Sequence, residues 1–338
     1  MKKFSGIDLH SNNSVVVICD VEDRVIFEKR LPNDLKQILK ALAPYREEIV
    51  GVVVESTYNW YWLVDGLMDN GYKVHLANPS AIKKYEGLKH SGDFADAAYL
   101  AHLLRLGLLP EGYIYPREGR AARDLARKRM QLVRYRTAQI LSIENILIQQ
   151  TGARMKSDAI KRLKRDEVKA LGFAPDVTLA MESNRAVMEV LQQQIDVLEK
   201  RLAKRVGLRS EYRVLKTTPG IGDTLATTIM LETGTVERFA GVGNFSSYCR
   251  CVDSKRESNG RKKGEGNVRN GNKYLAWAFV EAAHFACRYG PEAKSFYERK
   301  KKKTNTMVAT KALAHKLARA CYHMLKEQKP FDVNRCFA

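Results

Sequence analysis

The stretch KFSGIDLHSNNSVVVICDVEDRVIFEKRL, residues 3–31, decides the fold of the first third of the chain. It holds three runs of apolar and β-branched residues, and two polar turns, HSNN and VEDR, separate them. Short apolar runs bounded by turn residues are typical of β-strands that follow one another in a sheet. The stretch therefore predicts three antiparallel strands, and it places Asp8 at the end of the first strand.

The elements that follow alternate between helix and strand. Residues 35–42 have helical spacing, and EIVGVVVES (residues 48–56) is an apolar run of strand length, as expected of a strand covered on both faces. A helix closed by Gly71, a short strand stopped by Pro79 and a helix that begins GDFADAAYLAHLL (residues 92–104) complete the series. This order of elements is that of the ribonuclease-H-like fold, in which the first and fourth strands are adjacent and central.

Four carboxylates stand at the ends of these predicted elements. Asp8 and Glu55 end the first and fourth strands. Asp93 and Asp96 share one face of the last helix, because residues three apart are helix neighbours. Carboxylates that converge repel one another unless a cation neutralises them, and oxygen ligands suit Mg²⁺. We expect the four acids to be a catalytic set that holds one or two Mg²⁺ ions, with Mn²⁺ as an alternative.

A structural interpretation of the same acids stays open. Asp93 suits the N-cap of its helix, and Asp96 suits the first turn, where a negative charge is favoured by the helix dipole. Asp8, at the end of a strand, is equally suited to start a turn. The joint placement of all four acids is what favours the catalytic interpretation.

The charge of the chain is divided unevenly. Residues 1–115 hold 13 Lys and Arg against 15 Asp and Glu, a net charge of −2, so residues 116–338 carry +22 within the total of +20. This division favours a mildly acidic catalytic part joined to segments that bind a polyanion such as nucleic acid. A basic protein kept soluble by its charge is the alternative.

Other classes of protein are disfavoured by the sequence. No apolar run reaches the roughly 18 residues of a membrane-spanning helix, and MKKFSGIDLH at the N-terminus lacks the apolar segment of a signal peptide. The six cysteines are scattered and form no CxxC pair, so we expect neither a zinc site nor a disulfide framework. A reducing cytoplasm is the simplest compartment.

Two long helical patterns follow residue 116. Residues 117–150 have helical spacing throughout, with arginine dense in the first half. Residues 181–207 repeat apolar residues in steps of three and four, a heptad seam that predicts a helical hairpin or a coiled coil and offers a contact between protomers. We expect the first half of the long helix to bind phosphates through Arg117, Arg120, Arg123, Arg127, Lys128, Arg129, Arg134 and Arg136.

Two later segments favour contact with phosphate. TTPGIGDTLA (residues 217–226) places Gly220 and Gly222 before a helix, so a tight hairpin would present backbone N–H groups to a phosphate; a plain turn between helices is the alternative. DSKRESNGRKKGEGNVRNGNKYL (residues 253–275) contains Ser258, a candidate nucleophile because positive neighbours favour its alkoxide. The basic residues expected to surround a phosphate there are Arg256, Arg261, Lys262, Lys263, Arg269 and Lys273.

These motifs together resemble the IS110 family of insertion-sequence transposases, which are related to the Piv DNA invertases. TTPGIGDTLA is similar to the start of the family's C-terminal transposase domain, and SYCRCVDSKRESNGRKKGEGNVRNGNKYL is similar to the block that carries its serine. The resemblance covers nearly the whole chain, from residue 4 to residue 328. The acids similar to the family's DEDD set are Asp8, Glu55, Asp93 and Asp96.

The sequence departs from the family pattern around the serine. Cys251 and Asp253 stand where leucine and proline are usual, and Asn259 stands where glycine is usual. Ser258 is the best match to the family's nucleophile, with Ser254 as a minor alternative.

The resemblance implies a particular organisation and reaction. It implies a RuvC-like catalytic domain over residues 1–115, a basic long-helix and coiled-coil region over 116–210, a mainly helical transposase domain with a helix-hairpin-helix-like motif over 211–328 and a tail over 329–338. It also implies a phosphoserine link to DNA, strand exchange through a Holliday-junction intermediate, and a structured bridge RNA that selects donor and target DNA by base pairing. A tetramer, built as a dimer of dimers, is expected on the nucleoid in the bacterial cytoplasm.

Two other functions stay open from the sequence. One is a RuvC-like, Mg²⁺-dependent DNA nuclease or Holliday-junction resolvase, which would have no need of Ser258. The other is a non-enzymatic nucleic-acid scaffold that uses the glycine hairpin and the basic helices.

Overall fold

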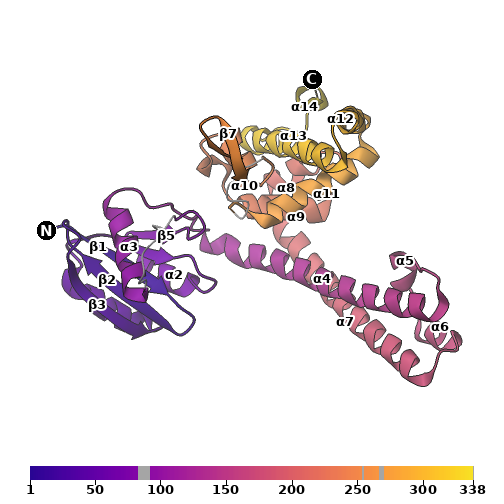
Figure 1. Cartoon of the computed structure of the whole chain (residues 1–338), viewed down its shortest axis with the longest axis horizontal. Coiled ribbons are helices and arrows are strands. Elements are labelled where there is room, and N and C mark those ends of the chain that lie inside the picture. The colour runs from indigo at the N-terminus through magenta and orange to yellow at the C-terminus, as the bar shows by residue number, and fades with distance from the viewer. Residues whose placement is uncertain (83–91, 253–254, 266–269, 338) are drawn as a thin grey trace. The chain divides into compact units, whose positions relative to one another are not determined.

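The computed structural model describes residues 1–82, 92–252, 255–265 and 270–337 of the 338-residue chain (Figure 1). The chain divides into two compact units. The first unit has a mixed α/β fold built on one sheet, and the second is mostly helical, as the sequence predicts. The first unit comprises Met1–Ile114 with Glu265–Asn270, and the second comprises Tyr115–Gly264 with Gly271–Ala338.

A five-stranded sheet organises the first unit. Its strands are β1 (Lys3–Leu9), β2 (Asn13–Cys19), β3 (Val25–Pro32), β4 (Ile49–Glu55) and β5 (Val74–Ala77). They lie in the order β3-β2-β1-β4-β5. β1 pairs antiparallel with β2, and β2 with β3, whereas β1, β4 and β5 run parallel. The first and fourth strands are thus adjacent and central, which confirms the sequence prediction.

Different helices cover the two faces of this sheet. α1 (Leu35–Leu42) and α2 (Tyr61–Asp69) pack on one face, and α3 (Asp93–Arg105) packs on the other. β1 contributes to both faces, because successive residues of a strand point to opposite sides. Ile7 belongs to the core with α1 and α2, whereas Phe4 belongs to the core with α3. The even-numbered residues of β1 therefore face α3.

Gly6 sets how closely α3 approaches β1. A Cβ atom at this position would lie 1.9 Å from the backbone oxygen of Ala97 and 3.0 Å from the backbone nitrogen of Ala101. Asp93 lies one helical turn before Ala97, and Asp8 lies two residues after Gly6. The close contact at Gly6 therefore carries the N-terminal turn of α3 over the C-terminal end of β1.

The substitution Gly6→Ala is expected to destabilise the first unit by about 1–3 kcal/mol, because overpacking a close contact forces the backbone apart. Thermal unfolding followed by circular dichroism should show a lower midpoint for the first unit. Gly243→Ala is the matched control, because a Cβ there meets no atom within 4 Å. An unchanged midpoint for Gly6→Ala would contradict the close approach of α3.

Two long helices form an antiparallel hairpin in the second unit (Figure 1). They are α4 (Arg117–Thr151) and α7 (Pro175–Val206), and the short helices α5 (Ser157–Ile160) and α6 (Arg165–Ala170) connect them. The heptad seam closes this hairpin within one chain. It therefore does not provide the contact between protomers that the sequence suggested. The buried seam residues are Met188, Ile195 and Leu202.

The remaining elements gather around a C-terminal apolar core that includes Phe245 and Phe279. None of the helices in the described part of the chain combines the length and apolarity needed to span a bilayer. These elements are α8 (Ser210–Leu215), α9 (Asp223–Thr233), α10 (Val242–Tyr248), β6 (Lys255–Ser258), β7 (Arg261–Glu265), α11 (Lys273–Tyr289), α12 (Pro291–Lys303), α13 (Thr306–Glu327) and α14 (Val333–Phe337). Two short 3₁₀ helices, η1 (Ala43–Tyr45) and η2 (Val236–Arg238), complete the set for the described residues.

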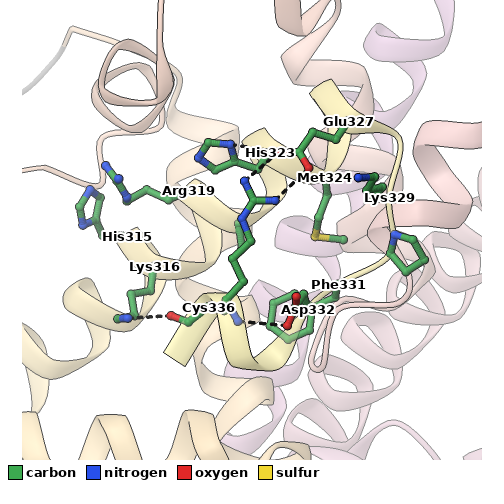
Figure 2. A pocket seen from close by; sticks show the side chains of 13 residues that line it. His315, Lys316, Arg319, His323, Met324, Glu327, Lys329, Phe331, Asp332 and Cys336 are labelled. Carbon is green, nitrogen blue, oxygen red and sulfur yellow. Dashed lines mark hydrogen bonds and ion pairs between the residues drawn. The ribbon is translucent and has the colours of Figure 1, made fainter. Parts of the chain in front are cut away.

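The last residues, expected as a tail, fold back on α13. A cavity of about 440 Å³ lies between α13 and residues 329–336. Figure 2 shows the side chains that line it. Arg335 donates two hydrogen bonds to Glu327, of 2.8 and 2.9 Å, and Lys316 donates one of 2.6 Å to the carbonyl of Cys336. The expected tail is therefore corrected to a packed segment of the helical unit.

Candidate active site

The end of β1 brings a buried carboxylate beside an imidazole. Asp8 is only 4% exposed. Nε2 of His10 lies 3.4 Å from an oxygen of Asp8 and 3.4 Å from an oxygen of Asp93, and this nitrogen is buried without a hydrogen-bond partner among the described residues. The carbonyl of His10 accepts hydrogen bonds of 3.0 Å from the side chains of Asn33 and Asn59. These bonds fix the backbone that positions the imidazole.

An arginine on β3 holds Asp93. A terminal nitrogen of Arg30 donates a hydrogen bond of 2.5 Å to Oδ2 of Asp93. The strand register explains the approach: Asp8 pairs with Val15, and Val15 pairs with Arg30, so the three side chains stand in one row on the α3 face. The bond from Arg30 lowers the pKa of Asp93. Asp93 is therefore kept ionised beside the buried carboxylate of Asp8.

The helix cap is not the role of Asp93. Gly92 is the N-cap of α3, and Asp93 is the first helical residue. Asp93 and Asp96 both lie in the first turn, where the helix dipole favours negative charge. The structure therefore corrects the capping interpretation, since the carboxylate of Asp93 is turned to Arg30 and His10.

Glu55 and Asp96 stand at the same end of the α3 face. Val53 of β4 packs in one cluster with Leu100 of α3, and Glu55 lies two residues after Val53. Asp96 lies one helical turn before Leu100, so the arrangement that carries the start of α3 over β1 also carries Asp96 toward Glu55. Both carboxylates are half-buried. The predicted acids thus share one end of one face of the sheet.

Three side chains form a group able to hold a metal ion. Asp8, His10 and Asp93 each offer a ligand atom, and these atoms lie within 4.8 Å of one another. Glu55 and Asp96, the other two predicted ligands, are outside this group. A divalent cation fits here, because it would neutralise a buried carboxylate and satisfy a buried nitrogen. Carboxylate oxygens suit Mg²⁺ and Mn²⁺, whereas an imidazole nitrogen favours a transition metal.

The sequence prediction missed His10 and Arg30. His10 stands two residues after Asp8, and residues two apart on a strand share a face, so this alternation was the signal that could have found it. Arg30 comes to the site through two strand pairings in succession. A shift of one residue in either pairing would turn Arg30 to the other face, so only the register reveals its role.

Ser258 stands at the tip of a two-stranded hairpin. β6 ends at Ser258, β7 begins at Arg261, and Asn259 and Gly260 between them have φ angles of 51° and 70°. A two-residue turn with two positive φ angles is type I′, which Asn-Gly favours. Asparagine tolerates this left-handed backbone, as glycine does, so the departure from the family pattern at residue 259 keeps the turn. The Ser258 side chain is exposed and is presented to solvent.

The segment that carries Ser258 is fixed to the helical core at both ends, at Arg250 and at Asn272. The backbone N–H of Asn272 donates a hydrogen bond of 2.6 Å to the carbonyl of Tyr248, and Arg250 donates one of 3.0 Å to the carbonyl of Gly271. Gly271 has a φ of 89°, and a Cβ there would lie 2.6 Å from the carbonyl oxygen of Tyr248. The segment that carries Ser258 therefore leaves the core and returns to it at one place.

A buried polar network reinforces this base. The side chain of Asn272 donates a hydrogen bond of 2.8 Å to Glu232 and accepts two from the first turn of α11. Glu232 is buried and accepts hydrogen bonds of 2.6 and 2.7 Å from Arg127. Burial alone would lower the pKa of Arg127, but the bonds to Glu232 outweigh burial, and the pKa is raised. Arg127, which we predicted to bind phosphate, thus joins α4 to α9 and α11.

Several other predicted phosphate contacts on α4 are also engaged with protein groups. Arg120 donates a hydrogen bond of 2.5 Å to the carbonyl of Tyr115, and the guanidinium of Arg123 lies 4.0 Å from the centre of the Tyr115 ring. Arg129 forms an ion pair of 2.6 Å with Glu199. The single phosphate-binding face expected on this helix is therefore corrected to a mixture of structural and exposed cations. The exposed members are Arg117, Lys128 and Arg134.

The two glycines of TTPGIGDTLA have different surroundings. Gly220 has a φ of 88°, and a Cβ there would lie 2.5 Å from the backbone nitrogen of Ala286, so this glycine permits close packing on α11. Gly222 is exposed, with no atom within 4 Å of such a Cβ. The carboxylate of Asp223 occupies the start of α9 and pairs with Lys216 at 2.6 Å. Gly220 therefore fits the alternative of a plain turn between helices, which packs closely on α11.

The structure describes some of the basic residues that we predicted to surround a phosphate near Ser258. Arg261 and Lys263 on β7 and Lys273 at the start of α11 are exposed. Their positive charges are exposed to solvent, on β7 and at the start of α11. The predicted residues outside the described part of the chain are Ser254 and Arg269, together with the side chains of Arg256 and Lys262.

Family comparisons match two parts of the chain. Residues 5–151 match a DEDD transposase model of the IS110 type, and this range contains the acid cluster with His10. Residues 212–298 match the model of the IS116/IS110/IS902 family of transposases, and this range contains Ser258 and its anchored base. A comparison with curated proteins gives no match. The chain therefore belongs to the IS110 family of transposases, enzymes that act on DNA.

Proposed function

We propose that this transposase cleaves and exchanges DNA strands through a serine-linked phosphodiester, and that a structured guide RNA directs it to donor and target DNA. The observation that carries the proposal is the pairing of two features in one chain: a group of Asp8, His10 and Asp93 able to hold a metal ion, and an exposed serine on an anchored hairpin. A nuclease that acts through metal ions alone would need the first feature and not the second.

The first unit supplies the acidic half of this proposed site. Its strand order, and the acids at the C-terminal ends of β1 and β4, support a RuvC-like, ribonuclease-H-like domain. Asp8 and Asp93, with His10 between them, are the ligands we propose for Mg²⁺ or Mn²⁺, and Glu55 and Asp96 complete the set. A bound divalent cation would stabilise the charge that develops on the phosphate oxygens. Arg30 keeps Asp93 ionised and aligned before any ligand arrives.

Ser258 supplies the proposed nucleophile. Its Oγ attacks a backbone phosphorus and gives its proton to water, and the bond from phosphorus to a deoxyribose oxygen breaks as that oxygen takes a proton from water. The hydroxyl end of another strand then loses its proton and attacks the phosphoserine, and the bond from phosphorus to Oγ breaks as Oγ regains a proton. The exposed cations Arg261 and Lys263 are placed to favour the alkoxide and the anionic transition state. We propose that the acids of one protomer and Ser258 of another act on the same phosphate in the assembly, as a composite site.

The nucleic-acid partners follow from the charge of the second unit. A net charge of +22 over residues 116–338 can hold a large polyanion. If base pairing to an RNA selects the DNA sequence, the protein surface needs to contact only the nucleic-acid backbones. Basic side chains make such contacts independently of sequence. We propose an assembly of four protomers with donor DNA, target DNA and a bridge RNA, in the bacterial cytoplasm.

The guide function is tested by reconstitution. The RNA that co-purifies with the protein from its host is sequenced, transcribed and added to protein with donor and target DNA. We expect joined products only when the RNA is present, and we expect a changed guide segment to redirect joining to a target with the complementary change. Joining at an unchanged rate without RNA would remove the RNA from the proposal and leave the serine chemistry standing.

A further inference from the structure

A basic cavity lies in the helical hairpin of the second unit. It has a volume of about 410 Å³, and α4, α7 and the connection between α5 and α6 line it. Its lining contains one acid, Glu189, against six cations. The cations are Arg136, Lys161, Arg162, Lys164, Arg165 and Arg185.

The fold holds these cations around the cavity. Ile160 at the end of α5 and Val168 in α6 are fully buried in the apolar core of the hairpin, and Leu163 between them packs against the same core. The packing of these three residues fixes the backbone of residues 161–165 against the hairpin. The charged side chains of this short segment therefore project from a backbone that is already fixed. Two of the cations also pair with acids outside the cavity lining, Lys161 with Asp158 at 2.9 Å and Arg165 with Glu182 at 3.4 Å.

Two of the arginines carry buried donors that lack acceptors. Nε of Arg136 and Nε of Arg185 are both buried without a hydrogen-bond partner among the described residues. Each guanidinium is oriented by another bond, from Arg136 to Gln192 and from Arg185 to Glu189 at 3.0 Å. Burial, with the nearby charge of Arg129, lowers the pKa of Arg136. An anion in the cavity would relieve the repulsion between the cations that surround it.

We propose that this cavity binds a backbone phosphate of nucleic acid; the choice of polymer rests on the function proposed above. Guanidinium and ammonium groups are the usual partners of phosphate oxygens. Among the described residues that line the cavity none is aromatic, and the apolar ones are Leu163 and Met188, so a base would find no ring on which to stack. The cavity therefore holds a strand by its backbone, independently of sequence, and anchors it on the helical hairpin.

Two double variants of the full-length protein test this site. Arg162→Gln with Lys164→Gln removes exposed cations, and Arg136→Gln with Arg185→Gln removes the buried donors. Arg201→Gln with Lys204→Gln is the control, because it removes the same charge from exposed positions of α7 outside the cavity lining. Affinity is measured by fluorescence anisotropy with a labelled single-stranded RNA, the same sequence as DNA, and a DNA duplex, each over a range of salt.

We expect each cavity variant to bind at least one of these probes about tenfold more weakly, because charged hydrogen bonds to the strand are removed. The slope of log affinity against log salt should also fall by about 0.7 to 0.9 for each phosphate that is no longer neutralised. A weakening confined to RNA or to DNA identifies the strand that is held. Equal affinities for the cavity variants and the control overturn the site.

Two further measurements separate phosphate binding from a purely structural role of the arginines and from the proposed strand exchange. If the arginines serve only the fold, Arg136→Gln with Arg185→Gln should unfold at a lower temperature without nucleic acid; we expect an unchanged or higher midpoint, because repulsion is removed. Strand joining by the wild-type protein is measured in parallel. Absence of joining, together with weaker binding by the cavity variants, would count against the proposed function and not against the cavity.

Discussion

Asp8→Asn is expected to lower the rate of strand exchange by at least about 10²-fold, because changes to groups that only support metal ligands already cost 10–100-fold. Asp8 is buried, and the ring of His10 is its contact in the site. Asparagine has the same shape, so the fold is retained, while the charge that binds a cation is lost. Strand exchange and Mn²⁺ affinity, the latter by isothermal titration, should fall together, and RNA binding should be unchanged.

The control for this prediction is Glu47→Gln, which removes a carboxylate from an exposed position of the same unit. It should exchange strands and bind Mn²⁺ as the wild type does. His10→Ala should weaken Mn²⁺ binding more than Mg²⁺ binding, because imidazole favours the transition metal. Wild-type exchange by Asp8→Asn would remove the acid cluster from the reaction.

Ser258→Ala is expected to reduce strand joining by at least about 10³-fold, because the variant lacks the nucleophile itself. Ser258 is exposed at the tip of a turn that Asn259 and Gly260 form, so alanine leaves the turn intact. Burial raises the pKa of the neighbouring Cys251 to about 12, so its thiol does not replace the serine. Joining is measured with labelled donor and target DNA.

Two serine variants make this result specific. Ser247→Ala removes an exposed hydroxyl from α10 and should join strands normally. Ser254→Ala tests the alternative nucleophile and should also retain joining. If Ser258→Ala still cleaves and joins DNA at the wild-type rate, the reaction is that of a metal-dependent nuclease or resolvase.

The sheet and the acids were predictable because their signals are local. The three strands of residues 3–31 are separated by polar turns, and the alternation of apolar residues sets which side chains share a face. The placement of Asp8 and Asp93 followed from the order of elements. The close approach of α3 was not predicted, because a glycine in a strand is compatible with many surroundings, and only the structure shows that Gly6 makes room for a helix backbone.

The hairpin that carries Ser258 and the structural role of Arg127 on α4 could not be predicted from the sequence. The Asn-Gly turn after Ser258 was a hairpin signal, but the strands on each side carry charged residues and no apolar face, so they resembled a loop. Arg127 resembled a phosphate ligand, and its partner Glu232 lies 105 residues away in the sequence. The local residue pattern around an arginine does not show whether it pairs with an acid far away in the sequence, so the structural role of Arg127 could not be predicted.

The most direct test of the serine mechanism is to find the bond between protein and DNA. Wild-type protein is incubated with donor DNA, target DNA and guide RNA, denatured, digested with nuclease and trypsin, and examined by mass spectrometry. The mechanism predicts a nucleotide attached through phosphate to Ser258, in the tryptic peptide ESNGR of residues 257–261. It predicts no such adduct in the Asp8→Asn variant. Strand exchange without any such adduct, or with the nucleotide on another residue, would contradict it.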